Sequence, residues 1–127
     1  MSGPLRVVVA DDHATVRENL RYLIDAERDL RCVGVTRDGR QALALCSELL
    51  PDVIVLDHDM PGLDGLTVAR ILERMRPRIR VIVYTLHEEI CSAAQSYGAV
   101  ACITKDAPYE TLLRAIRKSS ETRSPAA

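Results

Sequence analysis

The sequence has few aromatic residues, with four Tyr and neither Phe nor Trp. Its core must therefore be aliphatic, and it has almost no material for the stacking platform of a single-strand nucleic-acid binder. Acidic and basic residues nearly balance, giving a formal net charge of -1. No excess of one sign draws the whole chain to a polyanion, so a general nucleic-acid binder is disfavoured.

Long hydrophobic runs are also missing. The apolar runs are four to six residues long, and the first is interrupted by Arg6. We therefore expect no membrane span, no signal peptide and a cytoplasmic location. The 127 residues, 47% of them hydrophobic, suit one globular domain with an ordinary core.

The four cysteines form no C-x-x-C pair and have no histidine at a zinc-site spacing. We interpret all of them as reduced core thiols: Cys32, Cys46, Cys91 and Cys102. The alternative is a redox switch, which requires a lowered thiol pKa that a sequence does not display.

Five short apolar stretches, each followed by a helical pattern, recur along the chain. Several are almost continuously Val, Ile and Leu, which is typical of parallel strands covered on both faces. We expect strands at Leu5–Ala10, Leu30–Val35, Val53–Leu56, Arg80–Tyr84 and Val100–Ile103. Five strand–helix units predict an α/β fold, a flavodoxin-like, doubly wound, five-stranded parallel sheet of order 2-1-3-4-5 with five helices.

Helical spacing in the intervening segments supports this fold. Asp38-Gly-Arg-Gln41 resembles a capping box for the second helix. The fourth helix is expected over Glu88–Tyr97, with Gly98 as its C-cap, and the fifth over Pro108–Lys118. We assign residues 1–118 to the domain and 119–127 to a flexible tail or the start of a linker.

Polar residues follow the strands at one edge of this sheet. Asp11 and Asp12 end the first strand, Asp57 follows the third, Thr85 ends the fourth and Lys105 follows the fifth. In such folds ligands bind beyond the carboxyl ends of the strands, near the switch in winding direction. Three neighbouring carboxylates repel one another unless a cation neutralises them, and oxygen ligands suit Mg²⁺ or Mn²⁺.

With a metal present, Asp57 can attack phosphorus as a carboxylate nucleophile, while Lys105 and Thr85 bind the transferring oxygens. Each of these residues except Asp57 also has a plain structural interpretation. Asp11 and Asp12 can cap the first helix, Thr85 can be an ordinary strand residue, and Lys105 can be a solvated charge. Only their joint position favours the functional interpretation.

The segments VVVADD, VIVLDHDMPGLDG, VIVYT and CITKDAP resemble the receiver domain of two-component response regulators, from about Leu5 to Lys118. The fold is then CheY-like. DDHATVRENL and ITKDAPYETLLRAIR further resemble the NarL/FixJ-type branch, in which a receiver usually precedes a helix-turn-helix DNA-binding domain.

The resemblance implies that Asp57 is the phosphoacceptor, loaded by a histidine kinase, a phosphotransfer protein or a small phosphodonor. Asp12 and Asp57 bind Mg²⁺ directly, Asp11 acts through a metal-bound water, and the backbone carbonyl of Asp59 is a further ligand. Thr85 moves to the phosphoryl group on activation and Lys105 pairs with it. The output is then a population shift of the face built from the fourth helix, fifth strand and fifth helix.

The sequence departs from the family pattern at Cys102, where receivers commonly carry a Tyr or Phe that changes rotamer with the Thr. A small thiol does not report the state of the site as a ring does, so the switch is expected to use another route. Asp59 and His87 occupy the positions that tune the lifetime of the phosphoryl group. We interpret His13, His58 and His87 as partly exposed loop residues rather than metal ligands.

Two alternatives belong to other function classes. VIVLDHD also suits a haloacid-dehalogenase-like phosphatase, with Asp57 as nucleophile and Asp59 as acid/base, but in that family the D-x-D motif comes before the acidic pair. The other is a pseudo-receiver, a non-phosphorylated interaction module. Its usual mark is the loss of a site residue, and here only Cys102 supports it.

No helix-turn-helix follows Lys118, so we expect no direct nucleic-acid binding by this chain. DNA is expected to be reached through an output domain outside it, in a longer regulator whose linker begins near the tail. The stand-alone receiver is the alternative, and the sequence does not choose between a monomer and a homodimer.

Overall fold

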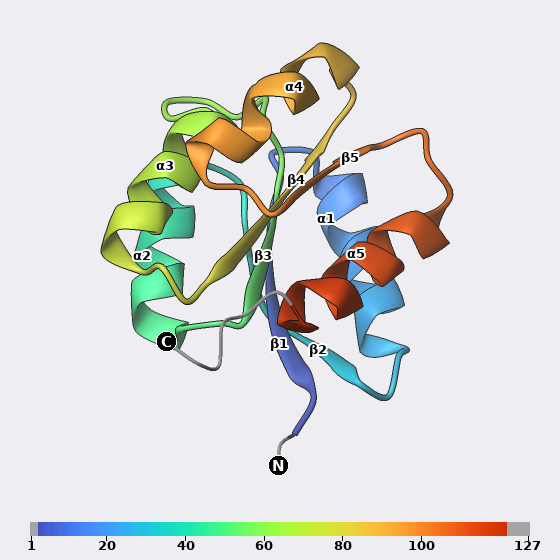
Figure 1. Ribbon diagram of the computed structural model, residues 1–127. Coiled ribbons are helices and arrows are strands. Elements are labelled where there is room, and N and C mark those ends of the chain that lie inside the picture. The colour runs from blue at the N-terminus through green and yellow to red at the C-terminus, as the bar shows by residue number, and fades with distance from the viewer. Residues whose placement is uncertain (1–2, 122–127) are drawn as a thin grey trace.

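The computed structural model describes residues 3–121, which form a five-stranded parallel sheet with helices on both faces (Figure 1). The strand order is β2-β1-β3-β4-β5, which confirms the predicted topology. The strands are β1 Leu5–Ala10, β2 Leu30–Thr36, β3 Val53–Leu56, β4 Arg80–Thr85 and β5 Ala101–Thr104. The helices are α1 Ala14–Asp25, α2 Gly39–Leu49, α3 Gly65–Met75, α4 Cys91–Ala94 and α5 Tyr109–Glu121, with 3₁₀ turns η1 Glu88–Ile90 and η2 Gln95–Tyr97.

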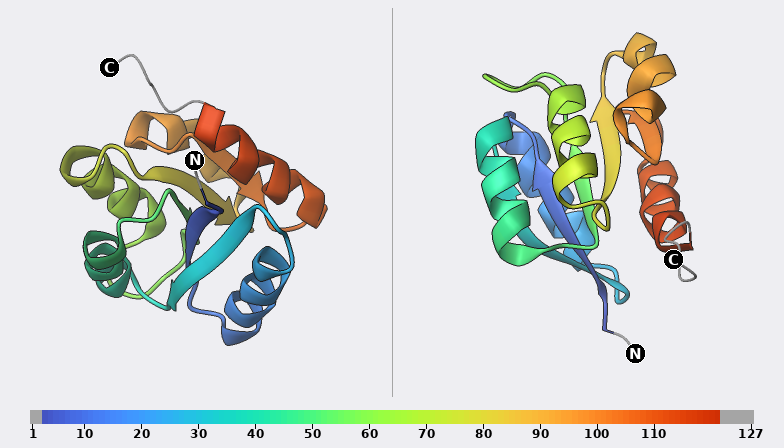
Figure 2. Two further views of the ribbon diagram at one scale, coloured as in Figure 1. Left: turned by 90° about the horizontal axis from the view of Figure 1, so that it is seen from below. Right: turned by 60° about the vertical axis from the view of Figure 1, so that its left-hand side comes forward.

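Apolar side chains alternate between the two faces of the sheet and form two cores. In β3, Ile54 and Leu56 pack with α2, α3 and α4, whereas Val53 and Val55 pack with α1 and α5. Figure 2 shows the sheet between these two helical layers. All four β3 side chains are buried, because a central parallel strand covered on both faces has no solvated side.

Helix ends follow local rules. Asp38 caps α2 and Asp64 caps α3, each accepting a backbone N–H three residues later at 2.9 Å. The N-cap of α1 is His13, so neither Asp11 nor Asp12 occupies the cap position that the structural interpretation gave them. Gly98 ends η2 with φ of 98°, a conformation that glycine adopts without steric cost.

The fourth helix lies where the sequence predicts it, but it is one short α-helical turn between two 3₁₀ turns. The hydroxyls of Ser92 and Ser96 donate to the carbonyls of Glu89 and Ala93, each three residues earlier. Such short-range bonds compete with the regular α-helical ladder. This segment is therefore the least regular helical part of residues 3–121.

The last helix ends later than the sequence predicts. Helix α5 continues to Glu121, so residues 119–121 are helical rather than part of a flexible tail. Ser119 is buried, and its hydroxyl donates to the carbonyl of Ile116 at 2.6 Å. The remainder of the predicted tail, 122–127, lies outside the described residues. Within residues 3–121 no helix is both long and apolar enough to cross a membrane.

The prediction that all four cysteines are reduced is wrong for Cys91 and Cys102, which form a disulfide. Their Cα atoms lie 5.4 Å apart because α4 packs against β5. This separation lies within the usual range for disulfides, and only the tertiary packing creates it. Cys32 and Cys46 are free thiols, with Cys46 buried and Cys32 half-buried.

Candidate functional site

Two aspartates lie side by side at the carboxyl ends of neighbouring central strands. The backbone N–H of Asp57 donates to the Ala10 carbonyl at 2.8 Å, which continues the β1–β3 pairing to the edge of the sheet. The N–H of Asp11 donates to the Thr36 carbonyl at 3.0 Å. Both residues are almost fully buried, with exposures of 1% for Asp11 and 2% for Asp57. The backbone thus fixes two buried carboxylates in adjacent positions.

Lys105 lies against both carboxylates. Its Nζ is 2.7 Å from Asp11 Oδ2 and 3.4 Å from Asp57 Oδ1, and the side chain is only 9% exposed. Its backbone N–H donates to the Thr85 carbonyl at 2.8 Å, which holds the loop after β5 against β4. Burial alone disfavours the ammonium form, but hydrogen bonds and charge from the two aspartates raise the pKa of Lys105 overall.

Asp57 is the electrostatically perturbed carboxylate of the site. Burial, and then the negative charge of Asp11, raise its pKa to about 6, although Lys105 and the Asp59 N–H partly oppose this. Oδ1 accepts the Asp59 N–H at 3.3 Å. Oδ2 is buried and has no hydrogen-bond partner among the described residues. A buried carboxylate oxygen without a partner is costly, so this atom points to a ligand.

Asp12 and His13 complete an acidic cluster at the same edge. One ligand atom from each of Asp11, Asp12, His13 and Asp57 lies within 4.8 Å of the others. Oxygen donors predominate in this group, as hard divalent cations require. The unpartnered oxygen of Asp57 also fits a cation there, so the residues could hold the metal that the sequence predicted.

Thr85, His87 and Asp59 connect two loops beside the cluster. Thr85 is fully buried, and its Oγ1 accepts the His87 N–H at 2.9 Å. The His87 side chain places Nε2 2.5 Å from Asp59 Oδ2, joining the loop after β4 to the loop after β3. The two predicted tuning positions are therefore in direct contact, and both side chains are about half exposed.

Cys102 lies on β5, three residues before Lys105, but its sulfur is bonded to Cys91 at the start of α4. It packs against the core on the α2, α3 and α4 side of the sheet. Cys102 therefore lies on the fifth strand, as the sequence predicts, but it is a disulfide-bonded residue rather than the expected free thiol.

Sequence reasoning underestimated His13 and did not identify Arg17. His13 is exposed, as expected of a loop residue, yet its Nδ1 is 3.0 Å from Asp11 Oδ1 and 3.2 Å from Asp12 Oδ1. Arg17 donates from α1 to the Asp11 carbonyl at 2.9 Å and holds that loop in place. The direct succession of Asp11, Asp12 and His13 after a strand was the available pattern for His13, whereas Arg17 follows only from the packing of α1.

Gly65 sets how closely α3 approaches the acceptor loop. A Cβ atom there would lie 2.5 Å from the Asp57 carbonyl oxygen and 2.7 Å from the His58 Cα. Both are backbone atoms, so a side chain at this position would force the loop to move. The Gly65 N–H donates to the His58 carbonyl at 2.9 Å, which keeps the contact tight.

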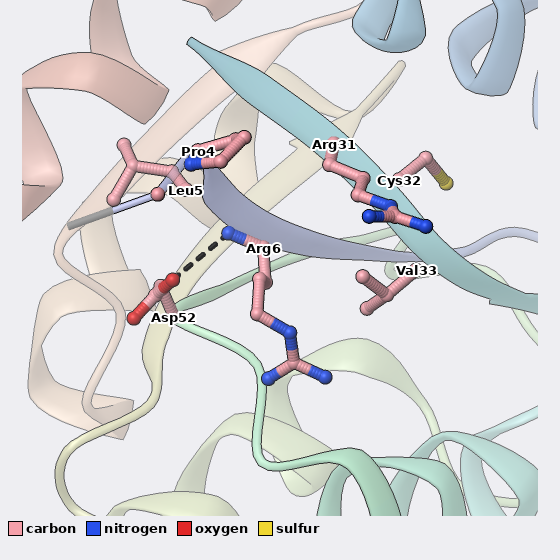
Figure 3. Close-up of a pocket in the computed structure, with 8 residues that line it drawn as sticks. Pro4, Leu5, Arg6, Arg31, Cys32, Val33 and Asp52 are labelled. Atoms are coloured by element: carbon pink, nitrogen blue, oxygen red, sulfur yellow. Dashed lines mark hydrogen bonds between the residues drawn. The ribbon is translucent and has the colours of Figure 1, made fainter.

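A cleft of 660 Å³ opens at the start of β1 and β2, at the end of the sheet opposite the carboxylates (Figure 3). Its polar groups maintain the fold, because the Arg6 guanidinium donates to the carbonyls of Leu49 and Leu50. The Arg6 N–H donates to Asp52 at 2.8 Å, as the dashed line shows. This cleft shares no residue with the acidic cluster.

Comparisons with known proteins agree with this geometry. A family model described as the response regulator receiver domain matches residues 7–117. The response regulator GacA of Pseudomonas aeruginosa is 37% identical over 116 residues, covering 90% of this chain and 54% of the relative. A protein-glutamate methylesterase/protein-glutamine glutaminase of Myxococcus xanthus is 42% identical over 112 residues, covering 86% of this chain and 32% of the relative. The chain thus spans about a third to a half of the length of these relatives.

Among solved structures, the receiver domain of the putative response regulator NarL from Mycobacterium tuberculosis superposes with a TM-score of 0.90 at 32% identity. The match covers 96% of this chain and all of that one. The nitrate/nitrite response regulator NarL of Escherichia coli is 33% identical over 119 residues, covering 92% of this chain and 55% of the relative. Fold, order of polar residues and matched range confirm the predicted family, and the chain belongs to the response regulator receiver domains.

Proposed function

We propose that this receiver domain accepts a phosphoryl group on Asp57. The observation that carries the proposal is the Asp57 carboxylate, which is buried at the end of β3, lies beside Lys105 and has one oxygen without a hydrogen-bond partner in residues 3–121. The donor is the phosphohistidine of a sensor histidine kinase or a phosphotransfer protein, or a small phosphodonor.

The transfer makes one bond and breaks one bond. A carboxylate oxygen of Asp57 attacks phosphorus, and the bond from phosphorus to the donor atom breaks with its electron pair leaving on the donor. Lys105 neutralises charge on the phosphoryl oxygens, since its ammonium already contacts Asp57 Oδ1 at 3.4 Å. The Asp57 side chain is almost fully buried, so its carboxylate has little contact with bulk solvent.

Asp12 and Asp57 would bind Mg²⁺ or Mn²⁺ directly, Asp11 through a metal-bound water, and Asp59 through its backbone carbonyl. The cation supplies positive charge that offsets the repulsion between the carboxylates and stabilises the phosphoryl oxygens. Asp11 also holds Lys105 in place at 2.7 Å, so one side chain supports both positive partners of the acceptor.

Thr85 couples the acceptor to the rest of the domain. Its hydroxyl now accepts the His87 N–H, and in the phosphorylated state it binds a phosphoryl oxygen instead. This exchange shifts the population of the face formed by α4, β5 and α5. Asp59 and His87 set the lifetime of the phosphoryl group, because their contact joins the two loops beside the acceptor.

The output is transcriptional control through a DNA-binding domain outside this chain, in the cytoplasm. One relative supports transcriptional control by its name, an uncharacterized transcriptional regulatory protein of Bacillus subtilis. The domain itself is a signalling acceptor with self-phosphorylation and autodephosphorylation activity. We assign it neither methylesterase activity nor direct binding of nucleic acid. A homodimer through the terminal helices or through the fourth-helix face is compatible with this function.

The experiment is intact-mass measurement after incubation with acetyl phosphate and Mg²⁺. The parent chain should gain one phosphoryl group, and both Asp57→Asn and a chelator control should gain none. No adduct on a folded parent chain that also fails to bind beryllofluoride would contradict phosphotransfer and favour the pseudo-receiver. Sustained turnover of a phosphomonoester would instead favour the phosphatase.

A further inference from the structure

The disulfide between Cys91 and Cys102 connects two segments that meet at Thr85. Cys91 is the first residue of α4, and the segment before it carries His87, whose N–H donates to Thr85 Oγ1. Cys102 pairs with Val83 in the β4–β5 ladder, and Thr104 pairs with Thr85 itself. The covalent bond therefore links α4, which follows the loop after Thr85, to β5, the strand that pairs with Thr85.

The rest of this region is held by few regular interactions. Within residues 3–121, β5 is an edge strand that pairs with β4 alone, and each of its four residues is only partly buried. α4 is a single short turn that packs against β5 (Figure 1). A covalent bond between two such elements restricts their relative movement more than it would between two elements of the central core.

The bonded cysteines lie beside an open cleft. Cys91 and Cys102 are both partly exposed, and they line an open cleft of 280 Å³ together with Ala94, Gln95 and Ala99 among others. Of the two free thiols, Cys46 differs in this respect, whereas Cys32 is half-buried like the bonded pair. Cys46 is fully buried, and burial raises its pKa to about 12, while burial also raises the pKa of Cys32. A small reagent thus reaches the bonded pair more readily than it reaches the Cys46 thiol.

We propose that Cys91 and Cys102 form a redox-active dithiol/disulfide site that exchanges with small thiols and disulfides, and that its oxidised form opposes the switching of Thr85. The second half rests on the proposed phosphoacceptor function. The disulfide is present in the arrangement in which the Thr85 hydroxyl is engaged by His87, so it stabilises that arrangement against the phosphorylated one. In reducing compartments disulfides are usually transient and redox-sensing, which fits the cytoplasmic location proposed above.

The chemistry balances with a small disulfide as the oxidant. One cysteine thiolate attacks a sulfur of the small disulfide, whose S–S bond breaks to give a mixed disulfide and one small thiol. The second cysteine then attacks the protein sulfur of the mixed disulfide and releases the second small thiol. The two cysteines lose two protons and two electrons in total, and the small disulfide gains them as two thiols. Excess small thiol reverses both steps.

The first test counts thiols. The full chain is equilibrated with graded ratios of reduced and oxidised glutathione, alkylated and weighed intact. We expect four alkylated thiols at the reducing limit and two at the oxidising limit, with peptide mapping that assigns the protected pair to Cys91 and Cys102. Cys32→Ser should keep this loss of two thiols, whereas Cys91→Ser should abolish it. A thiol count that is constant over the whole range would overturn the redox site.

The second test measures coupling by calorimetry of beryllofluoride binding in the presence of Mg²⁺. The oxidised protein should bind at least about five-fold more weakly than the reduced protein, the lower end of ordinary allosteric couplings. Cys91→Ser should bind like the reduced protein under both conditions, and Cys32→Ser should keep the difference. By reciprocity, beryllofluoride should shift the glutathione ratio at half oxidation by the same factor.

The outcomes separate the two proposals. Equal beryllofluoride affinity in both redox states, with normal interconversion of the thiols, overturns the coupling. No binding of beryllofluoride and no phosphoryl uptake in either state, with the same interconversion, contradicts the proposed function and supports the redox site alone.

Discussion

The central strands and the β4–β5 edge are built differently, although both carry residues of the same site. β3 is entirely buried between two helical layers and places Asp57 at its end. β5 is an edge strand of partly buried residues beside an irregular fourth helix, and it leads to Lys105. Rigid packing holds the acceptor carboxylate in position, while the looser edge has room to respond to it. The difference assigns chemistry to the centre of the sheet and signalling to its edge.

The largest effect is expected from truncating matched isoleucines in the two regions. Ile54→Ala in β3 should lower the free energy of unfolding by about 2–5 kcal/mol, because Ile54 is fully buried and its truncation leaves an enclosed cavity. Ile103→Ala in β5 should cost only about 1–2 kcal/mol, because that side chain is partly solvated. Urea denaturation of the reduced chain gives both values. Equal losses would contradict the difference in packing.

The acceptor carboxylate should destabilise the metal-free fold at neutral pH. The pKa of Asp57 is raised to about 6, so the folded state favours the protonated form, and stability falls as pH rises from the unfolded pKa through the folded one. Asp57→Asn should therefore unfold with a free energy higher by up to about 3 kcal/mol at pH 8. Little difference should remain at pH 4.

Urea denaturation at the two pH values with a chelator measures this effect, and added Mg²⁺ should narrow the gap at pH 8 because the cation favours the ionised parent carboxylate. A parent chain that is more stable than Asp57→Asn at pH 8 without metal would show that Asp57 is not electrostatically strained.

A smaller effect tests whether Asp59 and His87 act as a pair. Their contact predicts that Asp59→Asn and His87→Gln alter phosphoryl lifetime non-additively, with a coupling of about 0.5–1 kcal/mol. The rate at which the phosphoryl group is lost, followed by intact mass in the parent, the two single variants and the double variant, supplies the double-mutant cycle. Purely additive changes would mean that the two residues act on the phosphoryl group independently.

The smallest effect is expected at an exposed group of ion pairs between α5 and the loop that connects α1 to β2. Arg117 in α5 binds Asp29 at 2.7 Å and Glu27 at 2.8 Å, with all three side chains substantially exposed. The guanidinium hydrogen bond lowers the pKa of Asp29. Arg117→Ala should still cost less than about 1 kcal/mol, because solvent screens exposed ion pairs. Thermal unfolding in low and high salt measures this, and a loss unaffected by salt would point to packing of the arginine stem instead.

The same contrast decides what could be predicted from the sequence. The strand positions and their order followed from the apolar runs, because a strand buried on both faces is apolar at nearly every position. The acidic cluster followed because Asp11 and Asp57 stand directly after such strands, and parallel strands bring their carboxyl ends together.

The structure of the β4–β5 edge and its neighbouring loops was predicted less well from the sequence. The bond between Cys91 and Cys102 depends on how α4 packs against β5, which no local pattern records. The fourth helical segment also contains hydroxyl-to-carbonyl bonds from Ser92 and Ser96, which a hydrophobic pattern does not predict. The position of His13 against Asp11 and Asp12 depends on a rotamer. Each of these features is a specific contact of a side chain, which the apolar pattern of the strands does not record.

The division between a rigid acceptor and a responsive edge is tested most directly by amide hydrogen exchange of the reduced chain with and without beryllofluoride and Mg²⁺. We predict that exchange changes within residues 86–104 and is unchanged in Leu5–Ala10 and Val53–Leu56. A change in exchange that is concentrated in those central strands, or one that is spread evenly over the domain, would contradict the division between a rigid acceptor and a responsive edge.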